Sequence, residues 1–313
     1  MRQSTIINRI LQQQNADESL WDFLNRLPTS DFNSLMLRVL ESRVQQLSPP
    51  EVLQAYQRNK MFQPPDLPSS SYQDMDLLLL KYLPDEFELI DLAPVAPLGS
   101  CSVFGAVHQD KVLSALRGAE VLADNTNLLA FESAVRRRKL WQHDPKTKTT
   151  VDLANIHRLL RTQPLKDPKH TPHFRITSLT SAGRDMGNYE FEIAQLAKHI
   201  NFYCRFLQEG LGLQHLKGNI TLSPDLPSQW QKELLERVQQ RIPLNFEENP
   251  HREAINNYYQ TACFQINVLQ ADQEINIIDG GFTDWTQKLL NNRKERFIIS
   301  AMGTELLIRL AGL

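Results

Sequence analysis

The hydrophobic and polar positions of this chain follow two different periods, and the strand-like pattern is strongest near the C-terminal end. The runs 261–269 and 275–278 are rich in β-branched and aromatic residues, which predicts two neighbouring strands. We expect them to form an antiparallel pair joined at residues 271–272. Gly280 and Gly281 are expected to end the second strand, because a backbone without side chains can turn sharply or let a ligand approach closely.

Apolar residues with helical spacing dominate the N-terminal part. They predict successive helices over 19–27, 31–47 and 50–59, the last of them starting after a capping Ser48. A Pro- and Ser-rich stretch then separates these helices from the rest of the chain, which marks the clearest domain boundary. The predicted parts are a helical N-terminal extension of residues 1–62, a linker of residues 63–71 and a core of residues 72–313.

The core mixes helical and strand patterns. Helices are predicted over 72–82 and 190–211, the second of them long and amphipathic. A polar turn is expected at 124–127, before a helix that ends in the arginine triplet 136–138. Such a triplet could grip phosphate or RNA. On a helix end it more often forms a solvated face that compensates the helix dipole, and we favour this second interpretation.

The composition narrows the classes of function. A chain of 313 residues with 41% hydrophobic residues can bury a sizeable core, and we expect one large domain with a helical extension. The net charge of -2 gives no support to general nucleic-acid binding. Three cysteines, odd in number and far apart, predict neither a disulfide framework nor a CxxC metal site, so a reducing cytoplasm is expected. No run approaches about 18 apolar residues, so no membrane span is expected.

The segment around the first C-terminal strand resembles a known family. NPHREAINNYYQTACFQ lies in the register of NPxLVRGLDYYTGxVFE, a motif of the histidyl-tRNA synthetase group within the class II aminoacyl-tRNA synthetases. The residues kept in register are Asn249, Pro250, Tyr258, Tyr259 and Phe264. The closing SAMGTELLIRL at 300–310 is similar to motif 3 of the same family, and the resemblance as a whole covers residues 71–313.

The resemblance implies an α+β fold, in which an antiparallel sheet is flanked by helices, with an N-terminal helical extension and no anticodon-binding domain. It also implies a homodimer formed through the motif 1-like region at 72–94, and ATP with Mg²⁺ as the cofactor. A tRNA partner would follow as well, although the net charge does not support one. No zinc site is expected, because His170 and His173 have no third ligand nearby.

The family's motifs also imply a ligand-binding site, while no catalytic residue can be assigned. Tyr258 and Tyr259 are adjacent, so at most one of them can point into a pocket from a regular strand. Asp185 could bind an amino group or pair with a nearby arginine. The residues implied for the site are Asp124, Thr126, Arg161, Gln163, Arg175, Ser181, Asp185, Tyr258, Tyr259, Gly280 and Gly281.

Several positions depart from the family where its chemistry depends on charge. Ala254 and Leu306 stand where the family has arginines that support the amino-acid carboxylate and ATP, and Gln163 replaces the glutamate of motif 2. Adenylate formation brings a carboxylate and a triphosphate together, and losing one preorganised donor of this kind commonly costs about 3 kcal/mol. Standard histidine activation is therefore not expected.

The resemblance and its departures leave three functional hypotheses. The first is a non-aminoacylating paralogue that binds an amino acid or a nucleotide and acts as a regulatory or partner subunit. The family precedent is the regulatory subunit of ATP phosphoribosyltransferase in histidine biosynthesis, whose partner is the phosphoribosyltransferase catalytic subunit. The second is an ATP-dependent enzyme that activates or transfers an amino acid with altered specificity. The third is a scaffold with a vestigial pocket, in which residues 1–62 bind a protein partner.

Overall fold

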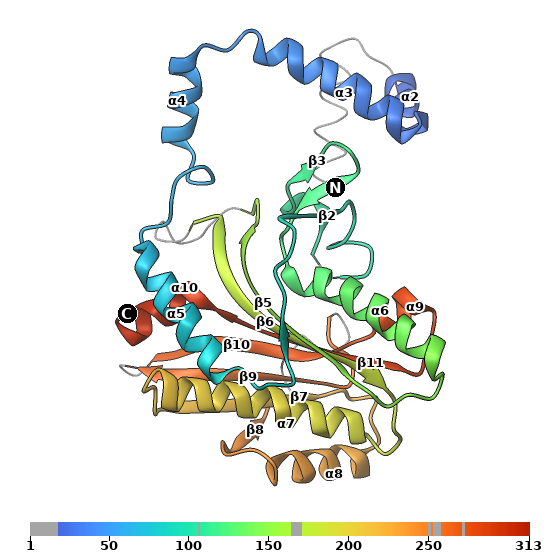
Figure 1. Cartoon of the computed structure of the whole chain (residues 1–313), viewed down its shortest axis with the longest axis vertical. Helices are drawn as coiled ribbons and strands as arrows, with labels where there is room; N and C mark the ends of the chain where they lie inside the picture. The colour runs from blue at the N-terminus through green and yellow to red at the C-terminus, as the bar shows by residue number, and fades with distance from the viewer. Residues whose placement is uncertain (1–17, 106, 164–170, 250–251, 253–257, 271–272) are drawn as a thin grey trace.

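A central sheet of eight strands organises the core of the molecule (Figure 1). The computed structural model describes residues 18–105, 107–163, 171–249, 252, 258–270 and 273–313. All neighbouring strands are antiparallel except the parallel pairs at the two edges, β1 with β5 and β7 with β8. In sheet order the strands are β1 (Glu88–Leu89), β5 (Val151–Leu160), β6 (His173–Arg184), β11 (Glu295–Gly303), β10 (Gln273–Thr283), β9 (Ala262–Gln270), β7 (Leu216–Leu222) and β8 (Phe246–Glu248).

Helices cover both faces of this sheet (Figure 1). The first face carries α5 (Ser69–Tyr82), α7 (Glu190–Arg205) and α10 (Thr304–Ala311), with α8 (Ser228–Gln239) packed against α7. The second face carries α6 (Asn125–His143), α9 (Trp285–Leu290) and a small sheet of β2 (Val95–Pro97), β4 (Ala119–Val121) and β3 (Ser114–Ala115). The predicted α+β fold, with a largely antiparallel sheet flanked by helices, is confirmed.

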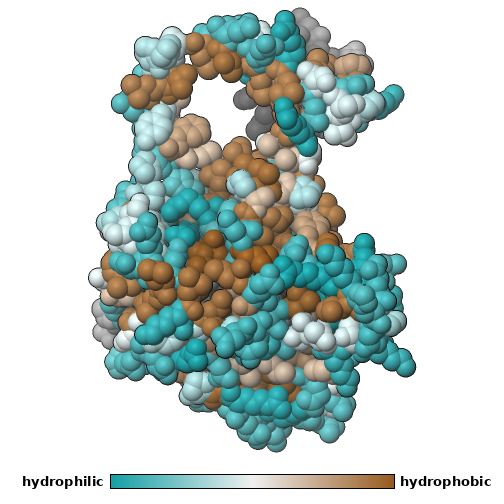
Figure 2. Space-filling view, in the orientation of Figure 1, coloured by the Kyte–Doolittle hydropathy of each residue, from teal (hydrophilic) through white to brown (hydrophobic). Residues whose placement is uncertain are grey.

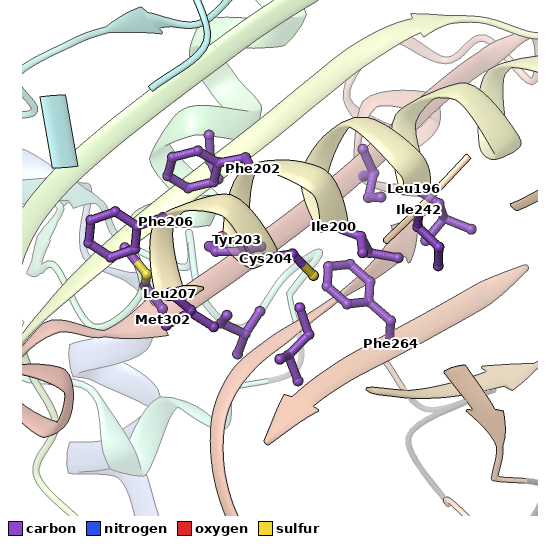
Figure 3. Close-up of a cluster of buried hydrophobic side chains, with 14 of the residues drawn as sticks. Leu196, Ile200, Phe202, Tyr203, Cys204, Phe206, Leu207, Ile242, Phe264 and Met302 are labelled. Carbon is purple, nitrogen blue, oxygen red and sulfur yellow. The ribbon is translucent and has the colours of Figure 1, made fainter. Parts of the chain in front are cut away.

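The main hydrophobic core lies between the sheet and α7 (Figure 3). Leu196, Ile200 and Tyr203 recur at helical spacing along α7, and all three are fully buried. Phe264 of β9 and Met302 of β11 reach the same cluster from the sheet. Burying a side chain of this size contributes roughly 1.5–3 kcal/mol, so this layer fixes the position of the sheet on which the site is built.

The two glycines of β10 lie inside the strand. β9 and β10 pair as the hydrophobic runs predicted, while the expected junction at 271–272 lies outside the described residues. The prediction that Gly280 and Gly281 end the strand is wrong, because β10 continues to Thr283 and both glycines pair with β11. A Cβ at Gly281 would lie 2.6 Å from the Cβ of Cys263 and from a ring carbon of Tyr259. Glycine is needed here for close strand packing, not for a turn.

Two helices begin earlier than expected. α5 starts at Ser69, within the residues assigned to the linker, and α6 starts at Asn125, where a polar turn was expected. Asp124 caps α6 by accepting a hydrogen bond from the backbone N–H of Thr126 at 3.0 Å. The run of short polar residues is therefore a helix start, in keeping with the preference of Asp for the N-cap position.

The prediction that the arginine triplet 136–138 forms a solvated face is wrong for its central residue, Arg137. Arg137 is fully buried and donates two hydrogen bonds to Glu295 of β11, at 2.8 and 2.9 Å. Its neighbour Arg136 forms an ion pair with Glu132 at 2.7 Å and another with Glu88. These arginines join α6 to the sheet, and the pairing leaves neither of them free to grip phosphate.

The N-terminal helices α2 (Glu18–Arg26), α3 (Thr29–Val44) and α4 (Pro49–Arg58) form an arm, residues 18–62, that arches away from the core (Figure 1). Ser48 precedes α4, and its backbone N–H donates to Glu51 at 2.7 Å, which confirms the expected cap. No residue of α3 or α4 is buried. In the described part of the chain, no helix is long and apolar enough to cross a membrane.

Candidate functional site

A cavity of about 410 Å³ opens on the second face of the sheet, beside the start of α6. Its walls come from distant parts of the sequence: strands β6, β10 and β11, the residue after β5 and the segment before β9. Its lining residues are Val107, Asp124, Thr126, Arg161, Ile176, Arg252, Tyr258, Tyr259, Asp279, Ile299, Ser300 and Ala301. Five of the residues implied by the family's motifs therefore meet here, namely Asp124, Thr126, Arg161, Tyr258 and Tyr259.

One wall pairs a carboxylate with a guanidinium. Asp124 accepts hydrogen bonds from the backbone N–H and the hydroxyl of Thr126, at 3.0 and 2.7 Å, which hold its side chain at the N-terminus of α6. The guanidinium of Arg161 lies 3.7 Å from the other Asp124 oxygen and donates to the carbonyl of Ala123 at 3.0 Å.

The opposite wall carries a second acid and base pair that the sequence did not reveal. Arg252 forms an ion pair with Asp279 and lies 5.7 Å from the ring centre of Tyr259. Asp279 also accepts a hydrogen bond from the hydroxyl of Tyr259 at 2.5 Å and one from Gln265 at 3.3 Å. Arg252 stands two positions before Ala254, so a guanidinium reaches the cavity although the family's arginine is missing.

Both tyrosines line the cavity. The limit of one tyrosine applies to a regular strand, whereas Tyr258 lies in a turn and Tyr259 in an isolated bridge before β9 begins. Their rings pack edge to face with centres 4.7 Å apart. Burial raises the pKa of both phenols well above the usual value, and the carboxylates Asp124 and Asp279 add to this shift. Both side chains are neutral hydrogen-bonding groups at physiological pH.

A second, smaller cavity of about 260 Å³ lies next to the first and shares Arg161 with it. Arg161 lies 5.3 Å from the ring centre of Phe174, and Leu306, which the sequence resemblance aligned with an arginine of the family, lines another wall. Arg309, one helical turn further along α10, lines the same cavity. Its lining residues are Pro65, Asp66, Arg161, Gln163, Thr171, Pro172, Phe174, Glu305, Leu306 and Arg309.

Five of the implied site residues line neither cavity, namely Arg175, Ser181, Asp185, Gly280 and Gly281. Ile176 of β6 points into the first cavity, so Arg175 and Ser181, at odd positions of the same strand, point to the opposite face. Arg175 pairs there with Asp76 of α5 at 2.5 Å. Ser181 hydrogen-bonds to the buried ring of His199 on α7 at 3.0 Å.

Asp185, the third of these residues, pairs with Arg296 at 2.9 Å beyond the end of β6. This structural pairing is one of the two roles that the sequence left open. Gly280 and Gly281 adjoin the first cavity only through Asp279, the residue before them on β10. Among the described residues, no group of three or more His, Cys, Asp or Glu side chains is placed to hold a metal ion.

The fold is that of the catalytic domains of class II aminoacyl-tRNA synthetases. Histidyl-tRNA synthetase from S. aureus superposes with a TM-score of 0.57 at 16% identity, over 80% of this chain and 70% of that one. An ATP phosphoribosyltransferase regulatory subunit/histidyl-tRNA synthetase from Bacillus halodurans gives 0.57 at 11% identity, over 81% and 84%. Histidyl-tRNA synthetase from Nostoc sp. PCC 7120 gives 0.54 at 12% identity, over 80% and 74%. No protein-family model and no curated protein matches the sequence.

Proposed function

We propose that this chain binds a zwitterionic small molecule, with a free amino acid as the simplest case, in the first cavity. The observation that carries the proposal is the charge balance of the lining. Arg161 and Arg252 are matched by Asp124 and Asp279, which stand on opposite walls of a cavity of about 410 Å³. An ammonium group can approach one carboxylate while a carboxylate group approaches one guanidinium, and each contact is charge-assisted.

The rest of the lining supports the same ligand class. Ile176, Ile299 and Ala301 offer an apolar floor for a side chain, and the neutral hydroxyl of Tyr258 adds a polar contact. A concave, mostly apolar site with a few placed polar groups is the usual form of a small-molecule site. The ligand's own side chain would lie against the β6 and β11 strands.

The residues present fit a nucleoside triphosphate poorly. In the second cavity Arg161 and Arg309 are balanced by Asp66 and Glu305, and Leu306 places an apolar side chain where the family has a cation. A triphosphate with its bound Mg²⁺ requires positive groups that face the growing charge. Adenylate formation is therefore not expected, and the proposed role is that of a non-aminoacylating regulatory or partner subunit.

A regulatory role is supported by the Bacillus halodurans protein, which is named as an ATP phosphoribosyltransferase regulatory subunit/histidyl-tRNA synthetase. The catalytic subunit of that transferase is therefore the first partner to test, and a role in histidine biosynthesis would follow from it. Co-purification of the two chains on one affinity tag is the direct measurement. Separate elution of the chains would remove this partner from the proposal and leave the ligand site unaffected.

The ligand proposal is tested by calorimetric titration of the full chain with each of the twenty standard amino acids. We expect at least one to bind, and we expect its methyl ester and its N-acetyl derivative to bind at least roughly tenfold more weakly, because each loses one charge. Asp124→Asn should weaken binding similarly. The matched control is Asp185→Asn, which breaks a carboxylate–guanidinium pair outside the cavity.

Two results would overturn this proposal. One is the absence of a heat signal for all twenty amino acids, with a folded protein shown by circular dichroism. The other is equal affinity for an amino acid and its ester, because a site that recognises a zwitterion must distinguish the two. Equal effects of Asp124→Asn and Asp185→Asn would place the binding site elsewhere.

A second candidate is an amino-acid-activating enzyme of altered specificity. It is favoured by two guanidinium groups that stand near the lost ones: Arg252, two positions before Ala254, and Arg309, three positions after Leu306. Amino-acid-dependent exchange of pyrophosphate into ATP tests it directly. Pyrophosphate exchange that disappears in Arg309→Gln would establish amino-acid activation by this chain. The absence of exchange with every standard amino acid would exclude this activity.

A further inference from the structure

The arm exposes a large area of apolar side chains to solvent. Thirteen large apolar side chains of the arm are between 38% and 63% exposed. They are Leu20, Trp21, Phe23, Leu35, Leu37, Val39, Leu40, Val44, Leu47, Val52, Leu53, Tyr56 and Phe62. Side chains of this size present on the order of 100 Å² each when half-exposed, so the arm offers on the order of 1,000 Å² of apolar surface.

Two of the three arm helices, α2 and α4, are too short to be stable without a packing partner. α2, α3 and α4 contain 9, 16 and 10 residues. Isolated helices shorter than about 12–15 residues are marginal in water, and most helix stability in proteins comes from packing of an apolar face. Because no residue of α3 or α4 is buried in the single chain, this packing surface must be supplied by something else.

The core carries a matching apolar surface beside the point where the arm touches it. Val95, Leu98, Val103 and Leu113 surround the small sheet and are between 38% and 82% exposed. In the turn of the same sheet, the backbone N–H of Arg117 donates to the side-chain oxygen of Asn33 on α3 at 2.8 Å. Figure 2 shows hydrophobic side chains both along the arm and on the core below it, with an open gap between them.

We propose that the arm packs on the core of a second copy of this chain, so that two copies exchange arms across a two-fold axis. Both halves of the interface belong to the same chain, as an isologous dimer requires. Two exchanged arms would bury on the order of 2,000 Å² in total, above the roughly 1,600 Å² of a standard stable interface. This inference does not rest on the proposed function.

The net charge of the arm and its connection to the core favour a second copy of this chain as the partner, over a nucleic acid or a membrane. Residues 18–62 contain five acidic and five basic side chains, so the arm carries no net charge that would select a nucleic acid or an anionic membrane. The connection to α5, residues 63–68, alternates half-buried and exposed positions and contains the three prolines Pro64, Pro65 and Pro68. A short connection between an arm and a core allows an identical element to be exchanged between copies at low cost.

The exchange is tested by cross-linking two full-length, differently tagged chains that are co-expressed. One carries Asn33→Cys and the other carries Arg117→Cys. A short bis-maleimide should join them into a product that contains both tags and has twice the chain mass. The native cysteines are buried and their pKa values are raised, so they contribute little background. The matched control pairs Asn33→Cys with Lys232→Cys on the exposed, distant face of α8.

Light scattering coupled to size exclusion measures the assembly itself. We expect a dimer, and we expect Leu37→Asp to raise its dissociation constant at least roughly tenfold, which corresponds to about 1.4 kcal/mol. Ser42→Asp on the same helix adds the same charge outside the apolar set and should change the constant by less than about threefold. Circular dichroism should show an unchanged core in both variants, because α3 buries nothing in its own chain.

Three outcomes would overturn the exchange. A monomer at every concentration up to about 100 μM excludes it outright. A cross-link within the double variant Asn33→Cys/Arg117→Cys, with none between the co-expressed single variants, means that the arm folds onto its own core. A dimer that dissociates with Leu77→Asp on α5 but not with Leu37→Asp means that copies meet through the motif 1-like region instead.

Discussion

The buried pair of Arg137 and Glu295 makes the most stringent prediction about stability. Both side chains are fully buried, and two hydrogen bonds of 2.8 and 2.9 Å join them. Arg137 also donates to the carbonyl of Thr149 at 2.6 Å, and Trp141 donates to Glu295 at 3.2 Å. Both carboxylate oxygens of Glu295 and two of the three guanidinium nitrogens of Arg137 are therefore hydrogen-bonded within the pair.

Glu295→Gln keeps the shape of this side chain but removes its charge. The guanidinium of Arg137 is then buried without a counter-ion, and breaking a buried pair in this way costs about 3–5 kcal/mol. Differential scanning calorimetry should show a fall in Tm of roughly 5–15 °C. Denaturant unfolding followed by tryptophan fluorescence should show a matching decrease in the midpoint concentration.

Two further variants separate the buried charge from other causes. Glu132→Gln weakens the partly exposed pair with Arg136, and such pairs contribute about 0–1 kcal/mol, so Tm should hardly change. The double variant Arg137→Met/Glu295→Leu should recover most of the loss, because it removes both buried charges together. The reasoning is refuted if Glu295→Gln costs less than about 1 kcal/mol, or if the double variant is less stable than the single one.

Three further predictions concern the buried groups around the site. Burial lowers the pKa of His199 to about 3, so below the unfolded pKa of about 6.5 only the unfolded state gains the proton. Stability should fall by about 2–3 kcal/mol between pH 6.5 and 4.5, and His199→Gln should flatten this slope relative to the natural chain in denaturant titrations. Gly281→Ala should cost about 1–3 kcal/mol and disturb Tyr259, because its Cβ would lie 2.6 Å from neighbouring atoms, whereas Gly303→Ala has 3.8 Å and should be neutral. The three buried cysteines have pKa values raised to about 11–12 and should react with Ellman's reagent at pH 8 only after unfolding, so rapid labelling of the native chain would contradict their burial.

The implied residues that meet at the first cavity are those whose position depends on local order along the chain. Asp124 and Thr126 lie at a helix start, Arg161 follows the end of a strand, and the two tyrosines precede a strand, so motif order was enough to bring them together. Such features are fixed by short-range backbone rules, which a single sequence carries.

The sequence failed where the answer depends on the face of a strand or on a distant partner. Arg175 and Ser181 were assigned to the site, but a shift of one position in a strand reverses the face to which a side chain points. Arg137 looked solvated because its partner Glu295 is 158 positions away. Arg252 lies outside the motif position that carries the family's arginine, so only its contact with Asp279 reveals it.

Arg161 contributes a single guanidinium to the walls of both cavities. One side chain cannot satisfy two anionic groups with the same donors, so a ligand that draws it away from Asp124 changes the other cavity as well. Two ligands that both contact this guanidinium would be thermodynamically linked, and the factor by which one changes the affinity of the other would be the same in both directions. Such a linkage would connect the small cavity to the large one without any movement of the sheet.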